Sequence, residues 1–584
     1  MRFKIISTLI LLFVINQSHS FVTVGNISSG ACNYTSLSQA LGNGEDEIRL
    51  VTDDITDNLI INHSVTITGG YANCSLANNP ITPVPTVNTF IYGTAVLGES
   101  VIKIILNSTN VNLNNLYITG GRQDVSVANG GHGIKIEGTS GFVSVRDSTI
   151  ADNKSENGGG VYLFPGTDAK HVSLINTTIF ANIAEVSASG NNGLGGGVYC
   201  RGTGGHVYIE GDSDISFNTA HNGGGIAAVH GCLVRVSSGI DVNSSSTRRG
   251  VMNNHANNNG GGVYTTNDAL VIFDPTLSGG AFAIRNSSNH PATLANNTAT
   301  VSGGGGYSAF GASLRVYDSL VHGNSANFGG GFNTTGMSHL VVDHSGLDCW
   351  NIGACSMISG NSSSRGGALF VTPSGSINES LIIHTVIKNN RSDVGTMLYI
   401  SGASGITVNT LTVYNSLFHN NGNNGIGGFS DSNGISLQNN ARLLLIGVTI
   451  ADNDIADGSA IISNSSSSLS LRESIVYNTD QVYSESQPVE LDASCLVVNE
   501  NNSISASNIY VEKPGFVNAV TGDYHLRPDS FAIDLCMDFG GSRKDFDFDS
   551  TGIDITSVPD VEGPVDAGSD EYNDHEAVFK NGFE

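Results

Sequence analysis

The chain has 584 residues, of which 73 are glycine, and only 13% of its residues are charged. Glycine usually makes up about 7% of a protein and charged residues about 25%, so this composition excludes a helical bundle and predicts a turn-rich β protein. The 52 acidic residues outnumber the 25 basic residues. Such a negative chain repels phosphate backbones, which argues against a nucleic acid as partner.

The N-terminal residues have the pattern of a secretory signal peptide. Arg2 and Lys4 precede an apolar run over 5–15, and a Ser-His-Ser triplet then offers small residues for cleavage. We expect residues 1–20 to be removed from an exported protein that is secreted or held at the cell surface; a signal anchor that stays attached is the alternative. No other stretch reaches 18 apolar residues, so no transmembrane segment is expected after cleavage.

Eight cysteines in an exported chain predict disulfides, although the sequence alone leaves their connectivity open. The spacing favours four local bridges, and it contains no zinc-binding pattern of thiolates. The favoured pairs are Cys32 with Cys74, Cys200 with Cys232, Cys349 with Cys355, and Cys495 with Cys536.

An internal repeat is the strongest signal in the sequence. Its unit is an apolar residue, two further residues and then asparagine, and its ten intervals average 32.5 residues and range from 25 to 43. A period of 20 to 50 residues indicates a solenoid, a propeller or an array. The repeated asparagines are Asn153, Asn182, Asn218, Asn254, Asn297, Asn324, Asn361, Asn390, Asn421, Asn453 and Asn478.

Glycine clusters recur at a nearly constant distance after these asparagines. Five or six residues after most of them, a cluster such as GGGVYLF at Gly158 or GGGVYTT at Gly260 opens an apolar strand. Asparagine and glycine both accept the left-handed conformation that sharp corners need. Clustered glycines let neighbouring backbones approach, and stacked asparagines can hydrogen-bond in ladders.

These features predict one right-handed parallel β-helix, in which each rung buries its apolar face only by stacking on the next. A propeller is disfavoured because the intervals are irregular, and a leucine-rich repeat because the leucine skeleton is absent. The expected fold is therefore all-β, a single solenoid with a short N-terminal capping helix and an irregular C-terminal cap.

The two ends of the solenoid need caps, because open edge strands would pair with other chains. We expect an N-terminal cap and first rungs at 21–75, with a short helix that begins at Thr35 and stops at Gly42. The β-helix repeats occupy 76–494. An acid-rich C-terminal cap segment follows at 495–575, and a polar tail at 576–584.

The acid-rich segment also contains the best candidate for a metal site. Asp545, Asp547 and Asp549 alternate, so an extended strand would place all three carboxylates on one face. Such a group requires a cation, either Ca²⁺ or the adjacent Arg543 and Lys544. Ca²⁺ is thus a possible cofactor, and an exposed charged strand is the simpler interpretation.

Catalytic residues stay unassigned. A polysaccharide lyase needs carboxylates beside an Arg or Lys base, and a hydrolase needs paired carboxylates. We interpret the candidates as solvated corner residues and the histidines near glycine turns as surface residues. The lyase candidates are Asp147, Asp152 and Glu156 with Arg146 and Lys154; the hydrolase candidates are Asp212 with Asp214, and Asp452 with Asp454 and Asp457; the histidines are His132, His221, His230 and His322.

The GG-hydrophobic-Tyr and hydrophobic-x-x-Asn repeats resemble right-handed β-helix repeat proteins of the pectate-lyase-like superfamily, and also the repeats of polymorphic outer membrane proteins. The C-terminal LRPDSFAIDLC and VDAGSDE and the N-terminal CNYTSLSQAL resemble bacterial choice-of-anchor Q domain proteins. Phe531 stands where that family usually has proline, and Ser569 where it has alanine. The resemblance implies a bacterial β-helix held at the cell surface, mostly of unknown function, and lends no catalytic residue.

Three functions follow as hypotheses. The first is a non-catalytic surface or secreted protein that adheres to a glycan or another cell-surface ligand through the long corner loops at 185–195 and 275–292. The second is a polysaccharide lyase or glycoside hydrolase acting on an extracellular polymer. The third is a structural component of the cell surface.

Overall fold

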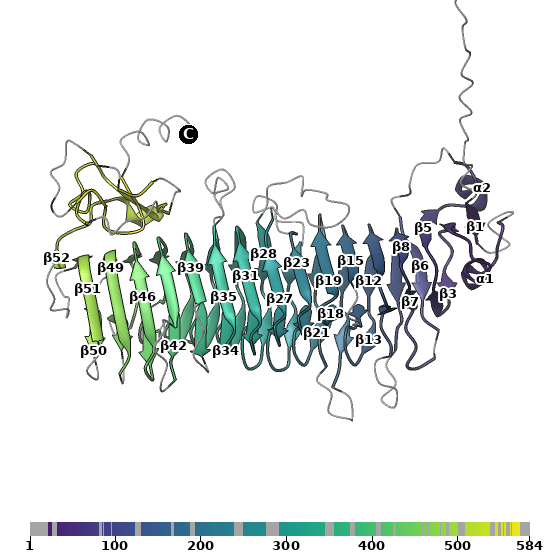
Figure 1. Cartoon of the computed structure of the whole chain (residues 1–584), viewed down its shortest axis with the longest axis horizontal. Helices are drawn as coiled ribbons and strands as arrows, with labels where there is room; N and C mark the ends of the chain where they lie inside the picture. Colours follow the sequence, from purple (N-terminus) through teal and green to yellow (C-terminus); the bar gives the residue numbers. More distant parts are fainter. Residues whose placement is uncertain are drawn as a thin grey trace, which may run out of the picture.

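The computed structural model of the chain is a parallel β-helix, whose strands stack rung upon rung along one long axis (Figure 1). This confirms the predicted all-β solenoid. The predicted signal peptide at 1–20, the Cys349 and Cys355 pair and the polar tail at 576–584 lie outside the described part of the chain. The structure describes residues 21–25, 32–80, 85, 87–94, 96–122, 130–164, 169–186, 193–238, 249–275, 291–344, 356–373, 380–403, 410–423, 428–456, 459–463, 466–478, 481–485, 490–499, 509–537, 544–546, 550–552, 554–555, 561 and 563–572.

Two parallel sheets run the length of the coil, with 30 strands in sheet A and 14 in sheet B, and a third, sheet C, has 8 strands along its middle part, from β13 to β41. One rung contains a long and a short strand of sheet A, then a strand of sheet C, then a strand of sheet B. The next rung repeats this order, so β11 (Gly141–Arg146) pairs in parallel with β15 (Lys170–Ile175).

The remaining long strands of sheet A are β1 (Val22–Val24), β2 (Glu47–Val51), β5 (Val65–Tyr71), β8 (Thr109–Asn114), β19 (Gly205–Glu210), β23 (Leu233–Val236), β27 (Leu270–Phe273), β31 (Ser313–Tyr317), β35 (His339–Asp343), β39 (Ser380–Ile383), β43 (Leu411–Tyr414) and β46 (Arg442–Ile446). Its short strands are β3 (Ile55–Thr56), β6 (Thr89–Tyr92), β9 (Leu116–Thr119), β12 (Thr149–Ala151), β16 (Thr178–Phe180), β20 (Asp214–Ser216), β24 (Gly250–Met252), β28 (Ala292–Ala295), β32 (Ser319–His322), β36 (Met357–Ser359), β40 (Val386–Lys388), β44 (Leu417–His419) and β47 (Thr449–Ala451). The two kinds merge in β49 (Ser468–Tyr477) and β51 (Glu490–Val498), and β52 (Ile509–Val511) follows.

Sheet B contains β4 (Leu59–Ile61), β7 (Ile102–Leu106), β10 (Ile134–Gly138), β14 (Val161–Leu163), β18 (Val198–Arg201), β22 (Ile226–Val229), β26 (Val263–Thr266), β30 (Gly306–Ala309), β34 (Phe332–Gly336), β38 (Leu369–Pro373), β42 (Leu398–Ser401), β45 (Ile435–Gln438), β48 (Ser459–Ser463) and β50 (Gln481–Glu485). Sheet C contains β13 (Lys154–Ser155), β17 (Ile183–Ala184), β21 (Thr219–Ala220), β25 (His255–Ala256), β29 (Thr298–Ala299), β33 (Ser325–Phe328), β37 (Ser362–Arg365) and β41 (Arg391–Val394).

The core is a column of apolar side chains from alternate strand positions. In β11, Val143 and Val145 point inward and lie over Val172 and Leu174 of β15. All four are shielded from solvent, and each side chain packs on its counterpart in the next rung. Burial of this kind contributes about 25 cal/mol per Å² of apolar surface. A single rung would leave this surface exposed to solvent, so its stability depends on its neighbours.

A buried amide ladder runs up the corner between sheets A and C. The side-chain nitrogen of each repeated asparagine donates to the side-chain oxygen of the next, as from Asn153 to Asn182 at 3.0 Å and from Asn254 to Asn297 at 3.0 Å. The nine side-chain bonds have the same geometry from Asn153 to Asn453, between 2.9 and 3.1 Å. Gly121 begins the ladder by donating its backbone N–H to Asn153.

The left-handed conformation belongs to the residue before each ladder asparagine from Asn153 to Asn453, and the expectation that the asparagine itself adopts it is wrong. Asp152 and Phe217 both have φ of 55°, whereas no ladder asparagine has a positive φ. The left-handed residue turns the chain so that the next side chain points into the coil. The asparagine is therefore required for its inward amide, and the turn is made by its neighbour.

The glycine clusters do have the close backbone approach that their sequence predicts. The first glycine of a cluster is left-handed, as at Gly158 with φ of 62°. A Cβ on Gly159 or Gly160 would lie 2.7 or 2.6 Å from a carbonyl oxygen of the next rung. Any larger residue would separate the rungs at this corner.

The N-terminal end has the expected short helix, α1 (Leu37–Gly42), with Leu37 and Ala40 fully buried against the first rung. Its N-cap is Ser36, whose hydroxyl accepts from the N–H of Gln39, and not the predicted Thr35. A second short helix, α2 (Cys74–Ala77), was not expected. Within the described residues, neither helix has the length and hydropathy of a membrane span.

Three of the favoured cysteine pairs form disulfides, with Cα atoms 5.2 to 5.9 Å apart, a normal separation. The first clips α2 to the N-terminal segment, and the second joins two neighbouring rungs inside the core. The third ties the C-terminal segment to β51. The bonded pairs are Cys32 with Cys74, Cys200 with Cys232, and Cys495 with Cys536.

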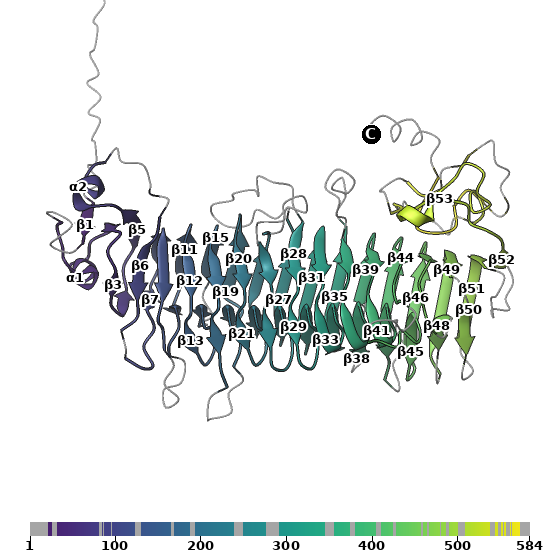
Figure 2. The same cartoon turned by 180° about the vertical axis from the view of Figure 1, so that it is seen from behind.

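The C-terminal segment packs against the flank of the last rungs rather than stacking on the final one, as both views show (Figures 1 and 2). It contains β53 (Phe516–Asn518), the 3₁₀ turn Ala519–Thr521 and β54 (Asp523–Leu526). Its apolar side chains bury outward residues of sheet A such as Ile475 and Val497. Those residues are apolar on the outer face, so this flank requires a cover.

We predict that Asn297→Ala destabilises the rungs around it by about 4 kcal/mol. The oxygen of Asn297 accepts from both the N–H and the side-chain nitrogen of Asn254, and each buried group left without a partner costs about 1–3 kcal/mol. Hydrogen exchange of the backbone amides of β24 and β28 measures this local stability.

The matched control is Asn257→Ala, an exposed asparagine on the rung before that of Asn297. Its effect should stay within about 0.5 kcal/mol. Equal protection in the two variants would contradict a stabilising role for the ladder.

Candidate functional site

The outward side chains of sheet B form a row of aromatic rings. In β14, Val161 points into the coil and Tyr162 therefore points out. Strand pairing places Tyr162 beside Tyr199 with ring centroids 5.2 Å apart, within the stacking range of aromatic pairs. This aromatic row comprises Tyr162, Tyr199, Tyr264, Tyr307, Phe370 and Tyr399, with Ala227 and Asn333 interrupting it after Tyr199 and Tyr307.

A groove of about 370 Å³ lies beside this row, where β14, β18, β22, β26 and β30 end. Val229 and Thr266 form its floor. Its far wall is the corner after the strands, where the backbone of Phe310 is left-handed and the side chain is 65% exposed. The lining residues are Asn157, Tyr162, Phe164, Leu194, Tyr199, Arg201, Val229, His230, Tyr264, Thr266, Asn267 and Phe310.

The groove is weakly charged. Arg201 is exposed and hydrogen-bonds to Tyr199, and burial raises the pKa of the Tyr199 hydroxyl in spite of this cation. Burial also raises the pKa of Tyr162 and raises that of Tyr307 to about 12. These hydroxyls therefore stay protonated at neutral pH. The lining residues that the structure describes include no carboxylate.

The size of this groove is typical of a small-molecule or glycan site, and polar atoms make up most of its exposed lining. Ligand sites are concave, about 300–1,000 Å³, mostly apolar, and carry a few convergent polar groups. Here aromatic rings supply the apolar surface, and Arg201, His230 and Asn267 supply the polar groups. The arrangement can hold sugar rings, which have apolar C–H faces and polar edges.

The sequence contained a signal for this groove that we did not use. The tyrosine of GGGVY recurs at Tyr162, Tyr199 and Tyr264, and each follows an inward valine. The repeat therefore predicts that these tyrosines point outward and stack. Of the predicted loops, Leu194 from 185–195 lines the groove, whereas most of 275–292 lies outside the described residues.

The histidines have different positions, and the surface interpretation is wrong for His132. That residue is fully buried, with its ring centroid 4.5 Å from that of Tyr162 and Nδ1 3.0 Å from the carbonyl oxygen of Gly158. It stacks on the first ring of the aromatic row, although Lys135 and not His132 is in register with Tyr162. His230 is exposed at the rim of the groove, and His322 is exposed beside Ser359.

The lyase candidates are not brought together. Asp147 and Asp152 lie at opposite ends of β12, and Asp147 accepts from Asn176 at 2.9 Å. Glu156 is fully buried, and Lys154 pairs with Glu185 at 2.8 Å. The contacts of Asp147 and Lys154 join neighbouring rungs, which agrees with our interpretation of them as corner residues. The buried Glu156 does not fit that interpretation.

The hydrolase candidates are also engaged by structural partners. Asp212 pairs with Arg249 at 3.0 Å, and Asp214 accepts from the hydroxyl of Ser216 at 2.6 Å. Asp452 accepts from the hydroxyl of Tyr524, which belongs to the C-terminal segment. Asp454 pairs through its backbone with Gly422, and Asp457 lies outside the described residues.

The predicted metal site is only partly described. Asp547 and Asp549 lie outside the described residues, whereas Asp545 is 2% exposed and accepts from the N–H of Glu571 at 3.1 Å. Lys544 and Ser550 face each other in an isolated antiparallel bridge. Among the residues that can be described, no three His, Cys, Asp or Glu side chains are placed to bind one metal ion.

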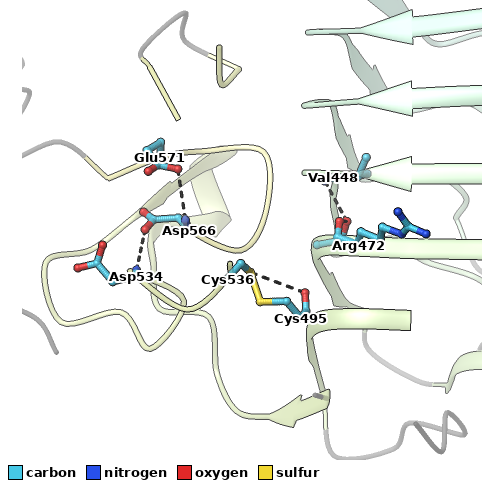
Figure 3. Close-up of a disulfide and its surroundings, with 8 residues drawn as sticks. Val448, Arg472, Cys495, Asp534, Cys536, Asp566 and Glu571 are labelled. Atoms are coloured by element: carbon cyan, nitrogen blue, oxygen red, sulfur yellow. Dashed lines mark hydrogen bonds between the residues drawn. A yellow bond between two sulfur atoms is a disulfide. The ribbon is translucent and has the colours of Figure 1, made fainter. Parts of the chain in front are cut away.

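The other acids of this segment act as acceptors for backbone N–H groups (Figure 3). Asp566 accepts from the N–H of Asp534 at 2.8 Å and from that of Tyr572 at 2.6 Å. Glu571 accepts from the N–H of Asp566 at 3.2 Å. Burial, with the nearby Glu571 carboxylate, raises the pKa of Asp566 well above its usual range. The acids therefore hold an irregular segment together.

No family model matches the chain, and no curated protein matches it in sequence. The β-helix is thus established by the strand pairings of this chain alone.

We predict opposite pH effects for two variants, one at the surface that the C-terminal segment covers and one within that segment. His419, which contacts Tyr524 of that segment, has its pKa lowered to about 4 by burial and by Lys388. The folded chain favours the neutral imidazole over the protonated one. The stability that His419 contributes is therefore complete above pH ~6.5 and is lost as the pH falls towards 4. His419→Gln should therefore gain up to about 3 kcal/mol relative to the wild type over that fall.

Asp566 has a raised pKa, so its stabilising effect is complete below pH ~4 and is lost as the pH rises through the folded-state value. Asp566→Asn should therefore gain stability relative to the wild type as the pH rises. Hydrogen exchange of the amides of Leu526 and Tyr572, corrected for intrinsic rates, measures both trends. Parallel pH profiles for the wild type and the two variants would refute both assignments.

Proposed function

We propose that this protein is an exported, non-catalytic β-helix that recognises a glycan through the groove of sheet B. The observation that carries the proposal is the groove itself, with five aromatic side chains and five polar ones on neighbouring rungs. Export to the cell surface or the medium is supported by the three disulfides and the signal-like N-terminus. The resemblance to choice-of-anchor Q domain proteins belongs to the same proposal.

The chemistry of the lining suits a sugar. The C–H faces of a pyranose pack on aromatic rings, and about 1 kcal/mol accompanies each good aromatic contact beyond the area that it buries. The hydroxyl groups find donors and acceptors in Arg201, His230 and Asn267. The tyrosine hydroxyls remain neutral donors because burial keeps their pKa high.

Binding is favoured over cleavage by the composition of the groove. Glycoside hydrolysis uses two carboxylates about 5–9.5 Å apart, and none lines the groove within the described residues. Four of the carboxylates that sequence analysis singled out are bonded to structural partners elsewhere: Asp147, Asp212, Asp214 and Asp452. We therefore assign the groove to recognition, and the polysaccharide lyase or hydrolase becomes an outcome of the test.

We predict that Phe310→Ala weakens glycan binding about tenfold. The side chain is largely exposed at the wall of the groove, so its loss removes a ligand contact worth about 1.4 kcal/mol without removing core packing. Affinity electrophoresis in gels containing a soluble β-1,4-glucan, glycol chitin or polygalacturonate measures retention of the protein.

Phe217→Ala is the matched control, because Phe217 is also left-handed and 40% exposed but lies at the corner after β20. It should be retained like the wild type. Equal retention of the two variants, or retention by none of the three polymers, would overturn the proposed function. Release of reducing sugar or of unsaturated product from a retained polymer would show an enzyme instead.

A further inference from the structure

A row of polar side chains runs along the outer face of the short strands of sheet A, beside the C-terminal segment. Ile387 points into the core, so its neighbour Lys388 points out. The strand pairings place the side chains of this polar row on successive rungs, about 4.8 Å apart. The members of the polar row, in order along the coil, are His322, Ser359, Lys388 and His419.

Lys388 carries a cation that no carboxylate neutralises. The side chain is half-buried, and burial alone lowers the pKa of its ammonium group. It forms no ion pair within the part of the chain that the structure describes, although the chain has 52 acidic and 25 basic residues. Lys103 and Lys154, by contrast, each pair with a glutamate, at 2.6 and 2.8 Å. A cation that is partly removed from water without a counter-charge favours an anion beside it.

His419 stands one rung further along and has a buried nitrogen without a partner. Its side chain is only 5% exposed, and its Nδ1 has no hydrogen-bond partner among the described residues. Tyr524 of the C-terminal segment covers the ring, with centroids 4.9 Å apart. Buried polar atoms of this kind are nearly always satisfied by some partner. A water molecule would satisfy this nitrogen but not the cation of Lys388, whereas an anion satisfies both.

We propose that the polar row binds a small oxyanion, phosphate or sulfate, between Lys388 and His419 at the margin of the C-terminal segment. Lys388 supplies the positive charge, and Nδ1 of His419 supplies a hydrogen bond. The buried hydroxyl of Ser359 supplies another from the opposite side of Lys388. An oxyanion has several oxygens and can contact side chains on three rungs at once. The site lies on sheet A, so this inference is independent of the groove on sheet B.

His322 positions the hydroxyl of Ser359. Its Nδ1 lies 3.0 Å from Oγ of Ser359, and its ring is exposed to solvent. When Nδ1 carries a proton, it donates to Oγ and leaves the hydroxyl hydrogen for the ligand. Beside the polar row, the apolar side chains of Met357 and Val386 are in register, and Val386 is buried. This apolar border lowers the local dielectric constant and so strengthens the attraction between Lys388 and an anion.

The test is equilibrium dialysis of the full chain against radiolabelled inorganic phosphate and, separately, sulfate, at neutral pH in chloride buffer. A single ion should bind to each chain. Lys388→Met should weaken binding about tenfold or more, because it removes the charge at the centre of the site. His419→Phe should also weaken binding, since it keeps a ring against Tyr524 but removes Nδ1. At about 10 mM, phosphate should slow hydrogen exchange of the Tyr524 amide in the wild type and leave it unchanged in Lys388→Met.

Lys103→Met is the matched control, because it removes the same charge from a half-buried lysine that pairs with Glu137, and Glu137 keeps Lys135 as a partner. It should bind both ions as tightly as the wild type. A preference for phosphate over sulfate would support the site and show that Nδ1 of His419 accepts a hydrogen bond from the ligand. Failure of the wild type to bind either ion, or undiminished binding in both Lys388→Met and His419→Phe, would overturn the site. Neither result would affect the proposed recognition of a glycan.

Discussion

The buried asparagine ladder sets the register on which the rest of this structure depends. Each amide oxygen accepts two donors from the rung before it, so the corners of successive rungs cannot slide past one another without breaking buried hydrogen bonds. Because the side-chain direction alternates along a strand, a slip of one residue would move every inward residue to the outside. The ladder thus determines which side chains face solvent as well as which fill the core.

The fixed register explains why the outward residues can vary from rung to rung while the inward residues stay similar. The inward positions hold valine, leucine or isoleucine on nearly every rung, but the outward positions of sheet B change from Tyr199 to Ala227 to Tyr264. Since the register is fixed from within, such changes alter the surface without altering the coil. The groove arises in this way, from a few small outward residues set between aromatic and corner side chains.

The sequence predicted the fold because the residues that recur in its repeat are the ones that point into the coil. Asn153 and its counterparts recur on the successive rungs from Asn153 to Asn478, and the glycines that let backbones meet recur on many of them. The corners were less predictable: the ladder asparagine was assigned the left-handed turn, yet the residue before it makes the turn. That residue is asparagine, glycine or aspartate at most corners, but it is Ala181 or Phe217 at two of them. The groove was missed because it has no motif of its own. Val229, Phe310 and Arg201 come together only through the register and the lengths of the intervening loops.

The acid-rich segment near the C-terminus follows from the end of the repeat. After β52 the backbone no longer has a neighbouring rung, so its N–H groups need other acceptors. Carboxylates provide two oxygens each, and Asp534, Asp566 and Glu571 all accept backbone N–H groups within the segment. The cost of burying so many acids shows in the raised pKa of Asp566. In this segment carboxylate side chains accept the backbone hydrogen bonds that the carbonyl groups of stacked strands accept elsewhere. This accounts for an acidic motif without requiring a metal or a catalytic role.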